Sequence, residues 1–133
     1  MAINFNNALG IHQHTIGIRA QRAEVLASNM ANVDTPHYKA RDLDFKTALA
    51  QANGSLNRQS LATTSEGHIG GQSHMSPEIK YRSVNQPDTG DGNTVDIQSE
   101  RSNYLQNALE YQASVQFLAS KFSGLNKAIK GGQ

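Results

Sequence analysis

Residues 101–130 read RSNYLQNALEYQASVQFLASKFSGLNKAIK, and this stretch decides the fold. Apolar side chains recur in it every seven positions, in two series separated by alternate steps of four and three. The first series is Tyr104, Tyr111, Leu118 and Leu125, and the second is Ala108, Val115, Phe122 and Ile129. An a/d heptad pattern sustained over nearly four repeats predicts a long helix that packs along a second helix as a coiled coil.

The ends of this helix carry recognisable start and stop signals. Asp96 or Ser99 can act as the N-cap, and Gly131-Gly132 follows the last heptad. We therefore expect the helix to begin at about Val95 or Ser99 and to end at Lys130, a length of roughly 50 Å at about 1.5 Å per residue.

A second long helix is predicted near the other end of the chain, from about Asn4 to Val33. Its apolar residues fall on two opposite faces at about 100° per residue. The first face comprises Phe5, Leu9, His12, Ile16, Ala20, Ala23, Ala27 and Met30, and the second comprises Ile11, Ile18 and Val25. We expect the interface between the two helices to be formed by Leu9, Ile16, Ala23 and Met30 with Tyr104, Tyr111, Val115, Leu118, Phe122 and Leu125.

The C-terminal helix also has apolar residues outside its heptad series, namely Leu109, Ala113 and Phe117. A helix with two apolar stripes needs two neighbours, because a large exposed apolar patch usually marks an interaction site. The second stripe is covered either by another molecule or by the middle segment folding back, and the sequence leaves both open. If another molecule covers it, a charge at Ile18 or Phe117 should block assembly without affecting synthesis.

The middle of the chain, residues 50–95, is poor in apolar residues and rich in Gly, Ser, Asn and Gln. One short helix is predicted from Asp44 to Ala52, capped by Asp44 and ended near Gly54. The alternation in 79–84 predicts a short strand or hairpin. The predicted fold is one mainly α domain, 1–133, made of an N-terminal helix (1–34), a polar, loop-rich middle (35–95) and a C-terminal helix (96–130).

Composition excludes several classes of function. There are 12 basic and 11 acidic residues, which leaves a net charge of +1, and no cysteine. Without a basic stripe or thiolates we expect no nucleic-acid partner, no disulfide and no thiolate metal site. No run approaches the roughly 18 apolar residues of a membrane span, and the N-terminus lacks the basic and apolar regions of a cleaved signal peptide. We expect no direct membrane insertion.

The stretch SNMANVDTPHYKARDLDF, residues 28–45, offers residue types used in catalysis and metal binding. Ser28 and His37 lack the strand–turn–helix context of a nucleophile. His12 and His14 are two apart, which places them on different sides of a helix. In PDTGDGNTVD the acid expected at the twelfth position of a calcium loop is replaced by Ser99. We therefore predict a non-enzyme with no catalytic residue, cofactor or metal, and a helix that ends before Pro36.

Three segments resemble the flagellar rod and hook axial proteins of bacteria. These are LASNMANVDTPHYKARDLDF (26–45), LATTSEGHIGG (61–71) and GNTVDIQSERSNYLQNALEYQ (92–112). The last two are similar to segments of a proximal rod member of that family. Family members commonly carry Gly where this chain has His37, so a turn with positive φ there would be tolerated at some cost.

The resemblance implies a structural subunit of the proximal rod, whose terminal helices pair within a tube that crosses the periplasm and transmits torque. It implies as partners another proximal rod subunit (FlgC-like), a FliE-like junction protein, the MS ring and the flagellar type III export apparatus. Export by that apparatus needs no cleaved signal, and Phe5 with Leu9 resembles the recognition pattern of its substrates.

Combining this resemblance with the two stripes, we expect folding to be coupled to assembly. The residues expected in subunit packing are Ile11, Ile18, Val25, Asn29, Asn32, Leu109 and Phe117. A cytoplasmic helical adaptor for flagellar type III export would have similar helices and is the alternative function. A cell-wall hydrolase would need a cleft with paired acids, which the sequence does not indicate.

Overall fold

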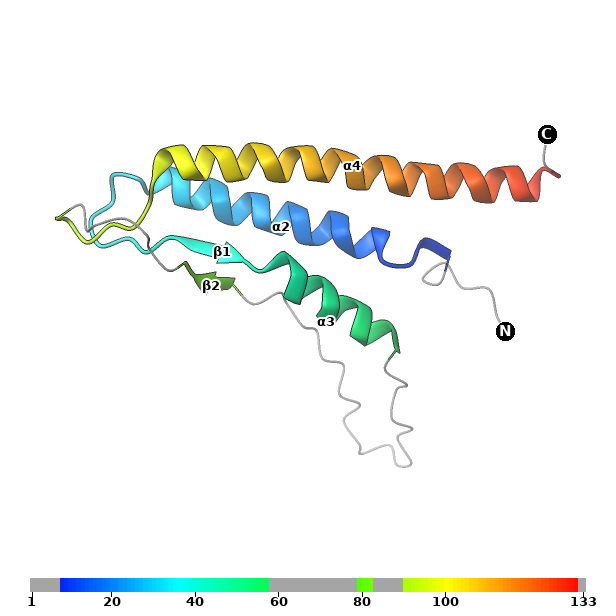
Figure 1. The fold of residues 1–133 in the computed structure, drawn as a ribbon, viewed down its shortest axis with the longest axis horizontal. Coiled ribbons are helices and arrows are strands. Elements are labelled where there is room, and N and C mark those ends of the chain that lie inside the picture. Colours follow the sequence, from blue (N-terminus) through cyan, green and yellow to red (C-terminus); the bar gives the residue numbers. More distant parts are fainter. Residues whose placement is uncertain (1–7, 58–78, 83–89, 132–133) are drawn as a thin grey trace, which may run out of the picture.

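The computed structural model describes residues 8–57, 79–82 and 90–131, which form helices near both ends of the chain and a short strand pair between them (Figure 1). The elements in order are α2 (His12–Ala31), β1 (Arg41–Leu43), α3 (Phe45–Asn57), β2 (Ile79–Tyr81) and α4 (Ile97–Ile129). The predicted mainly helical fold is confirmed, with long helices near both ends and a strand in the middle region.

Helix α2 lies between two layers. It runs antiparallel to α4 on one side, and the strand pair with α3 lies on its other side (Figure 1). With 33 residues against 20, α4 is about 50 Å long and α2 about 30 Å. The C-terminal part of α4 therefore projects past the start of α2 (Figure 1).

The predicted N-terminal helix is shorter than expected. Gly10 adopts φ +54°, a left-handed conformation that a continuous right-handed helix does not contain. Helix α2 therefore begins at His12, and the Thr15 hydroxyl donates to the His12 carbonyl at 2.7 Å. Phe5, half of the export pattern, lies outside the described residues, and Leu9 is half-buried.

The predicted caps hold for the other two helices. Asp96 accepts a hydrogen bond from the Gln98 backbone N–H at 3.0 Å, and Gly131, just past the end of α4, takes φ +80°. Asp44 accepts from the backbone and the hydroxyl of Thr47 at 3.1 and 2.6 Å. Helix α3 continues past Gly54 to Asn57, because one glycine inside a helix costs only about 1 kcal/mol.

Strands β1 and β2 pair antiparallel, with Arg41 opposite Tyr81 and Leu43 opposite Ile79. β2 confirms the predicted strand over its described part, and residues 83–84 lie outside the described residues. β1 is not predicted from the sequence, because three residues are too few to show an alternating pattern.

The apolar core is small and lies under α2. Ile18, Leu43 and Ala48 are buried together, and Phe45, Leu49 and Ala52 pack around them half-buried. On the α4 side of α2 the buried residues of α4 are polar: Glu100, Asn107 and Ser114. The apolar cluster therefore lies between α2 and the layer of the strand pair and α3, whereas the buried residues of α4 contact α2 through hydrogen bonds.

Candidate functional site: a polar helix interface and an exposed apolar face

The end of α2 is tied to the segment that precedes α4 by one side chain. The amide of Asn93 donates to the carbonyls of Asn32, Val33 and Thr35 at 3.1, 2.7 and 3.0 Å. Its oxygen accepts from the Val95 N–H at 2.9 Å. Carbonyls at a helix end have no intrahelical partner, so Asn93 satisfies them from outside the helix.

In the turn after α2, His37 has the positive φ that is expected at a position where family members commonly carry glycine. His37 adopts φ +62°, and its N–H donates to the Asp91 carbonyl at 3.0 Å. Its ring lies against Gly92, where a Cβ atom would stand 2.8 Å from the His37 Nδ1. The position thus requires positive φ, and histidine occupies it at a modest cost in strain.

Asn29 is fully buried and joins three elements. Its amide donates to the Arg41 carbonyl at 2.7 Å and to Glu100 Oε2 at 3.1 Å. Its oxygen accepts from the Arg41 N–H at 3.1 Å. Asn29 is one of the residues predicted for subunit packing, and in the structure these contacts are made inside the chain, between α2, β1 and α4.

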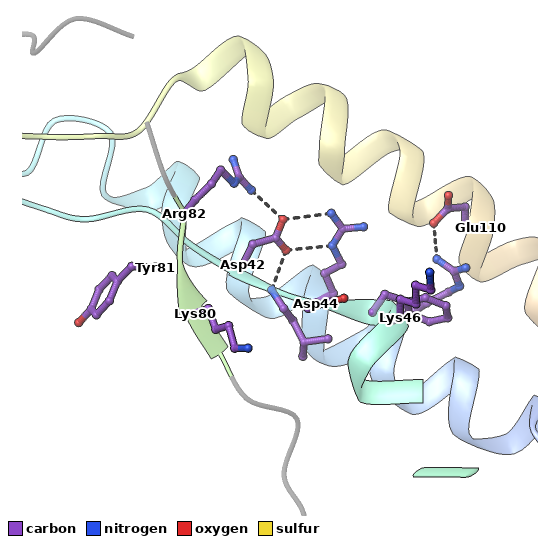
Figure 2. A pocket seen from close by; sticks show the side chains of 11 residues that line it. Asp42, Asp44, Lys46, Lys80, Tyr81, Arg82 and Glu110 are labelled. Carbon is purple, nitrogen blue, oxygen red and sulfur yellow. Dashed lines mark hydrogen bonds and ion pairs between the residues drawn. The ribbon is translucent and has the colours of Figure 1, made fainter. Parts of the chain in front are cut away.

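Next to Asn29, four charged side chains form a network of ion pairs: Arg22, Asp42, Arg82 and Glu100. Asp42 accepts two hydrogen bonds from Arg22, at 2.9 and 3.1 Å, and one from Arg82 at 3.0 Å (Figure 2). Arg82 also pairs with the buried Glu100. Burial by itself would raise the pKa of Asp42, but the hydrogen bonds from Arg22, the Leu43 N–H and Arg82 hold this pKa below its usual range. The network connects α2, β1, the residue after β2, and α4.

The α4 side that faces α2 is polar and also repeats every seven residues. The Asn107 amide donates to the Arg19 carbonyl at 2.9 Å, and Arg19 Nε donates to Ser114 Oγ at 3.2 Å. Arg19 also pairs with Glu110. Sequence reasoning missed this interface, although the seven-residue spacing of Glu100, Asn107 and Ser114 was the signal that could have revealed it.

Several heptad side chains predicted for the helix–helix interface are only partly covered. Tyr104, Tyr111, Val115 and Phe122 are between 37% and 42% exposed, whereas Leu118 and Leu125 are half-buried. The fully buried positions of α4 are instead polar, because Arg19 and Asn29 of α2 need polar partners when they are taken out of water. The partners predicted on α2, Leu9, Ile16, Ala23 and Met30, are all half-buried.

An exposed apolar surface therefore runs along α4. It includes Leu109, at 68% exposure, which the sequence assigned to subunit packing. We call the exposed apolar residues of α4 the α4 apolar face. They form two groups at about 100° per residue: a stripe of Tyr104, Tyr111, Val115, Phe122 and Ile129, and, further round the helix, Leu105 and Leu109. Phe117 is also 59% exposed but points elsewhere, with its ring 6.1 Å from that of His12.

The second stripe of α2 is covered within the chain at Ile18. This residue is only 6% exposed and packs with Leu43 and Ala48. Of the two alternatives for the second stripe, the one in which the middle segment folds back is therefore observed at Ile18. A charge at Ile18 would disturb folding of the monomer, so it does not test assembly. The other predicted packing residues of α2, Ile11, Val25 and Asn32, are half-buried.

The catalytic candidates are not brought together. Ser28 Oγ lies 3.3 Å from the Tyr38 hydroxyl, and the contact made by the His37 backbone is to Asp91. Within 8–57, 79–82 and 90–131, no three His, Cys, Asp or Glu residues are grouped so that they could bind a metal. None of the helices described is long and apolar enough to cross a membrane.

Comparison with known proteins finds similar chains that carry the same name in three bacteria. The chain is 56% identical over 133 residues to "Flagellar basal body rod protein FlgB" of Aeromonas hydrophila, with all of both chains covered. It is 40% identical to the protein of that name from Salmonella typhimurium (94% of each chain covered), and 41% identical to that from Cereibacter sphaeroides (96% of this chain and 97% of the other). No family model matches the chain.

Proposed function

The chain belongs to the FlgB family of flagellar basal body rod proteins and is a structural subunit of the rod, and we propose that it assembles there through the α4 apolar face. The observation that carries this proposal is the exposure of seven large apolar side chains along one helix. Exposed apolar surface of this extent usually marks an interaction site. Neighbouring subunits would cover it and remove it from water.

The spacing of these residues suits a helical partner. Tyr104 and Tyr111 are seven apart, as are Val115 and Phe122, so they form a stripe of the kind that packs into grooves on another helix. Because α2 is already held on the polar side of α4, the stripe remains available to a neighbour. Phe117 adds a second exposed contact near the start of α2.

We propose specific neighbours from the family resemblance: a FlgC-like rod subunit, a FliE-like junction protein and the MS ring. We further propose that the chain reaches the periplasmic rod through the flagellar type III apparatus, without a cleaved signal peptide, and that it has no catalytic role. Membership of the rod family does not favour the alternative of a cytoplasmic export adaptor.

Folding coupled to assembly follows from the same distribution of side chains. Only five apolar residues of the described part of the chain are buried, namely Ile18, Leu26, Ala40, Leu43 and Ala48, so the monomer gains little from burial against the entropy cost of ordering its helices. Covering the α4 apolar face in the rod would add burial at about 25 cal/mol per Å². The subunit would therefore be more rigid in the rod than alone.

Leu109→Glu tests the proposal. Because Leu109 is 68% exposed, the substitution should change the free energy of unfolding of the monomer by no more than about 0.5 kcal/mol. It should nevertheless abolish swimming and remove the chain from purified basal bodies, as measured by quantitative mass spectrometry.

Two control variants accompany it. Leu109→Met keeps an apolar side chain at the same position, and Gln21→Glu adds a negative charge on the exposed side of α2. Both should be recovered in basal bodies at the level of the wild type. Recovery of Leu109→Glu at that level, with normal swimming, would contradict assembly through the α4 apolar face.

A further inference from the structure

The C-terminal end of α4 extends beyond the start of α2 (Figure 1). The ring of Phe117 lies against that of His12, the first residue of α2, with 6.1 Å between their centroids. Every later residue of α4 lies past this contact. We call residues 118–130 the α4 overhang.

The polar stripe of α4 continues into the overhang, but α2 no longer covers it there. Ser114, the last buried residue of that stripe, accepts a hydrogen bond from Arg19. The next position in the seven-residue series is Lys121, which is exposed. The side of α4 that faces α2 elsewhere is therefore accessible at Lys121.

The overhang is positively charged. It contains Lys121, Lys127 and Lys130 and no acidic residue. All three lysines are exposed, and none of them forms an ion pair with the described part of the chain. Lys127 and Lys130 complement the negative partial charge at the end of α4. Lys121 lies more than two turns before Ile129, so the end of the helix does not explain its charge.

Apolar side chains follow one side of the overhang. Phe122 and Ile129 are seven residues apart and are 42% and 82% exposed, and the half-buried Leu125 lies beside them. At about 100° per residue, Lys121 and Lys130 fall on opposite edges of this stripe. In a coiled coil the apolar stripe packs against the partner helix, and charged residues along its edges pair with those of the partner. The overhang therefore has the layout of one helix of a coiled coil, with cations on both edges.

The charge of the overhang restricts the choice of partner. The described helices of this chain contain three carboxylates. Glu100 is buried, and Glu110 is paired with Arg19. Glu24 is then the remaining carboxylate on these helices, and it cannot match three lysines. A different protein with an acidic helix therefore fits the overhang better than a second copy does.

We infer that the α4 overhang binds an acidic amphipathic helix of another rod protein, whose apolar side covers Phe122 and Ile129 and whose carboxylates pair with Lys121 and Lys130. The inference rests on the proposed function, because the stripe of the overhang is part of the α4 apolar face. It adds the shape and the charge of the partner. Since the lysines are exposed, the preference for acidic helices should weaken as salt is added.

The test uses the full chain and a fluorescein-labelled synthetic helix of four heptads, with leucine at the a and d positions and glutamate at e and g. Fluorescence anisotropy at low salt should detect binding of this glutamate peptide to the wild type. The same peptide with lysine at e and g should bind at least about tenfold more weakly, because its charges repel those of the overhang. The double variant Lys121→Glu with Lys130→Glu should reverse this preference. Phe122→Ala should weaken binding of the glutamate peptide about fivefold, a loss typical of one interface anchor.

The matched control is Lys39→Glu with Lys46→Glu, which makes the same change of charge at two exposed positions outside α4. It should keep the preference of the wild type for the glutamate peptide. Circular dichroism checks that every variant retains the helix content of the wild type. Equal losses in the two double variants, or equal binding of the two peptides by the wild type, would overturn the inference.

Two further measurements address other occupants of the overhang. Sedimentation with phosphatidylglycerol vesicles in place of peptide binding would assign the lysines to a lipid surface. Dimerisation of the wild type in sedimentation velocity, lost in Lys121→Glu with Lys130→Glu, would assign them to a second copy. Either result would overturn the inference. Leu109 lies outside the overhang, so Leu109→Glu should retain full peptide binding, and failure of the proposed function is distinguishable from failure of this inference.

Discussion

At the scale of single residues, Asn29 determines how the end of α2 meets the rest of the chain. It is completely buried, and its amide bonds both to the backbone of Arg41 and to the carboxylate of Glu100. An amide can donate and accept at once, so one side chain serves a strand and a helix. The hydroxyl of its neighbour Ser28 lies 3.3 Å from the Tyr38 hydroxyl.

Asn29→Ala should therefore lower the free energy of unfolding by about 2–3 kcal/mol, because it removes the partner of the Arg41 N–H and carbonyl and one of the hydrogen bonds to the buried Glu100. Urea unfolding followed by circular dichroism measures this change. Ser28→Ala is the control and should cost no more than about 0.5 kcal/mol. Equal effects of the two substitutions would show that the buried amide has no special role.

His37 shows at the same scale what the sequence can and cannot determine. The resemblance to a family with glycine at this position indicated the need for positive φ, and the observed value is +62°. The neighbour that accommodates the ring, Gly92, is 55 positions away in sequence and was not predicted. Contacts between distant segments depend on how the whole chain folds.

At the scale of elements, α4 carries two adjacent stripes with the same seven-residue repeat and different chemistry. The polar side, with Glu100, Asn107 and Ser114, bonds to α2. The α4 apolar face is exposed. Polar groups in a helix interface lower stability but specify one register, because only one alignment satisfies their hydrogen bonds. The arrangement fixes α2 against α4 and keeps the apolar side for other subunits.

Asn107→Leu tests the cost of this arrangement. The Asn107 amide donates to Arg19, but its buried Oδ1 accepts no hydrogen bond from any group in the described part of the chain. Replacing a half-satisfied buried amide by leucine should raise the free energy of unfolding by about 1 kcal/mol, measured by urea unfolding.

Asn103→Leu, half-buried on the same helix, is the comparison and should have a smaller effect. If Asn107→Leu lowers the free energy of unfolding instead, the hydrogen bond to Arg19 contributes more than the unpaired oxygen costs. The account of a register-specific but weakened interface would then be wrong.

At the scale of the whole molecule, the three layers are joined by the ion-pair network around Asp42. This carboxylate bonds to Arg22 on α2 and to Arg82 beyond β2, and Arg82 continues to Glu100 on α4. The apolar cluster of Ile18, Leu43 and Ala48 joins α2 to β1 and α3 and includes no residue of α4. The network is therefore the connection that links all the layers, and its charge state should affect the stability of the whole fold.

The pH dependence follows from the lowered pKa of Asp42. Its pKa in the unfolded chain is about 3.9, and in the folded chain it is lower, so the unfolded state binds more protons in this range and stability rises with pH. The contribution is present above about pH 4 and is lost as pH falls through the folded pKa. Urea unfolding should show Asp42→Asn about 2 kcal/mol less stable than the wild type at pH 7, with the difference shrinking below about pH 4.

Asp34→Asn removes an exposed carboxylate in the turn after α2 and serves as the control. It should leave the free energy of unfolding unchanged at pH 7. A difference between the wild type and Asp42→Asn that is the same at acid and neutral pH would contradict an ionised Asp42 as the centre of the network.

The sequence by itself determined where α3, α4 and the end of α2 lie, because caps, heptad spacing and proline act on the local chain. It also indicated the family and the two-sided character of the long helices. Only the tertiary structure decided which side of α4 meets α2. Apolar attraction has no direction and would accept either partner, whereas the hydrogen bonds of Asn29 and Arg19 are satisfied in one arrangement alone. Those bonds join residues far apart in sequence, so they exist only once the chain has folded.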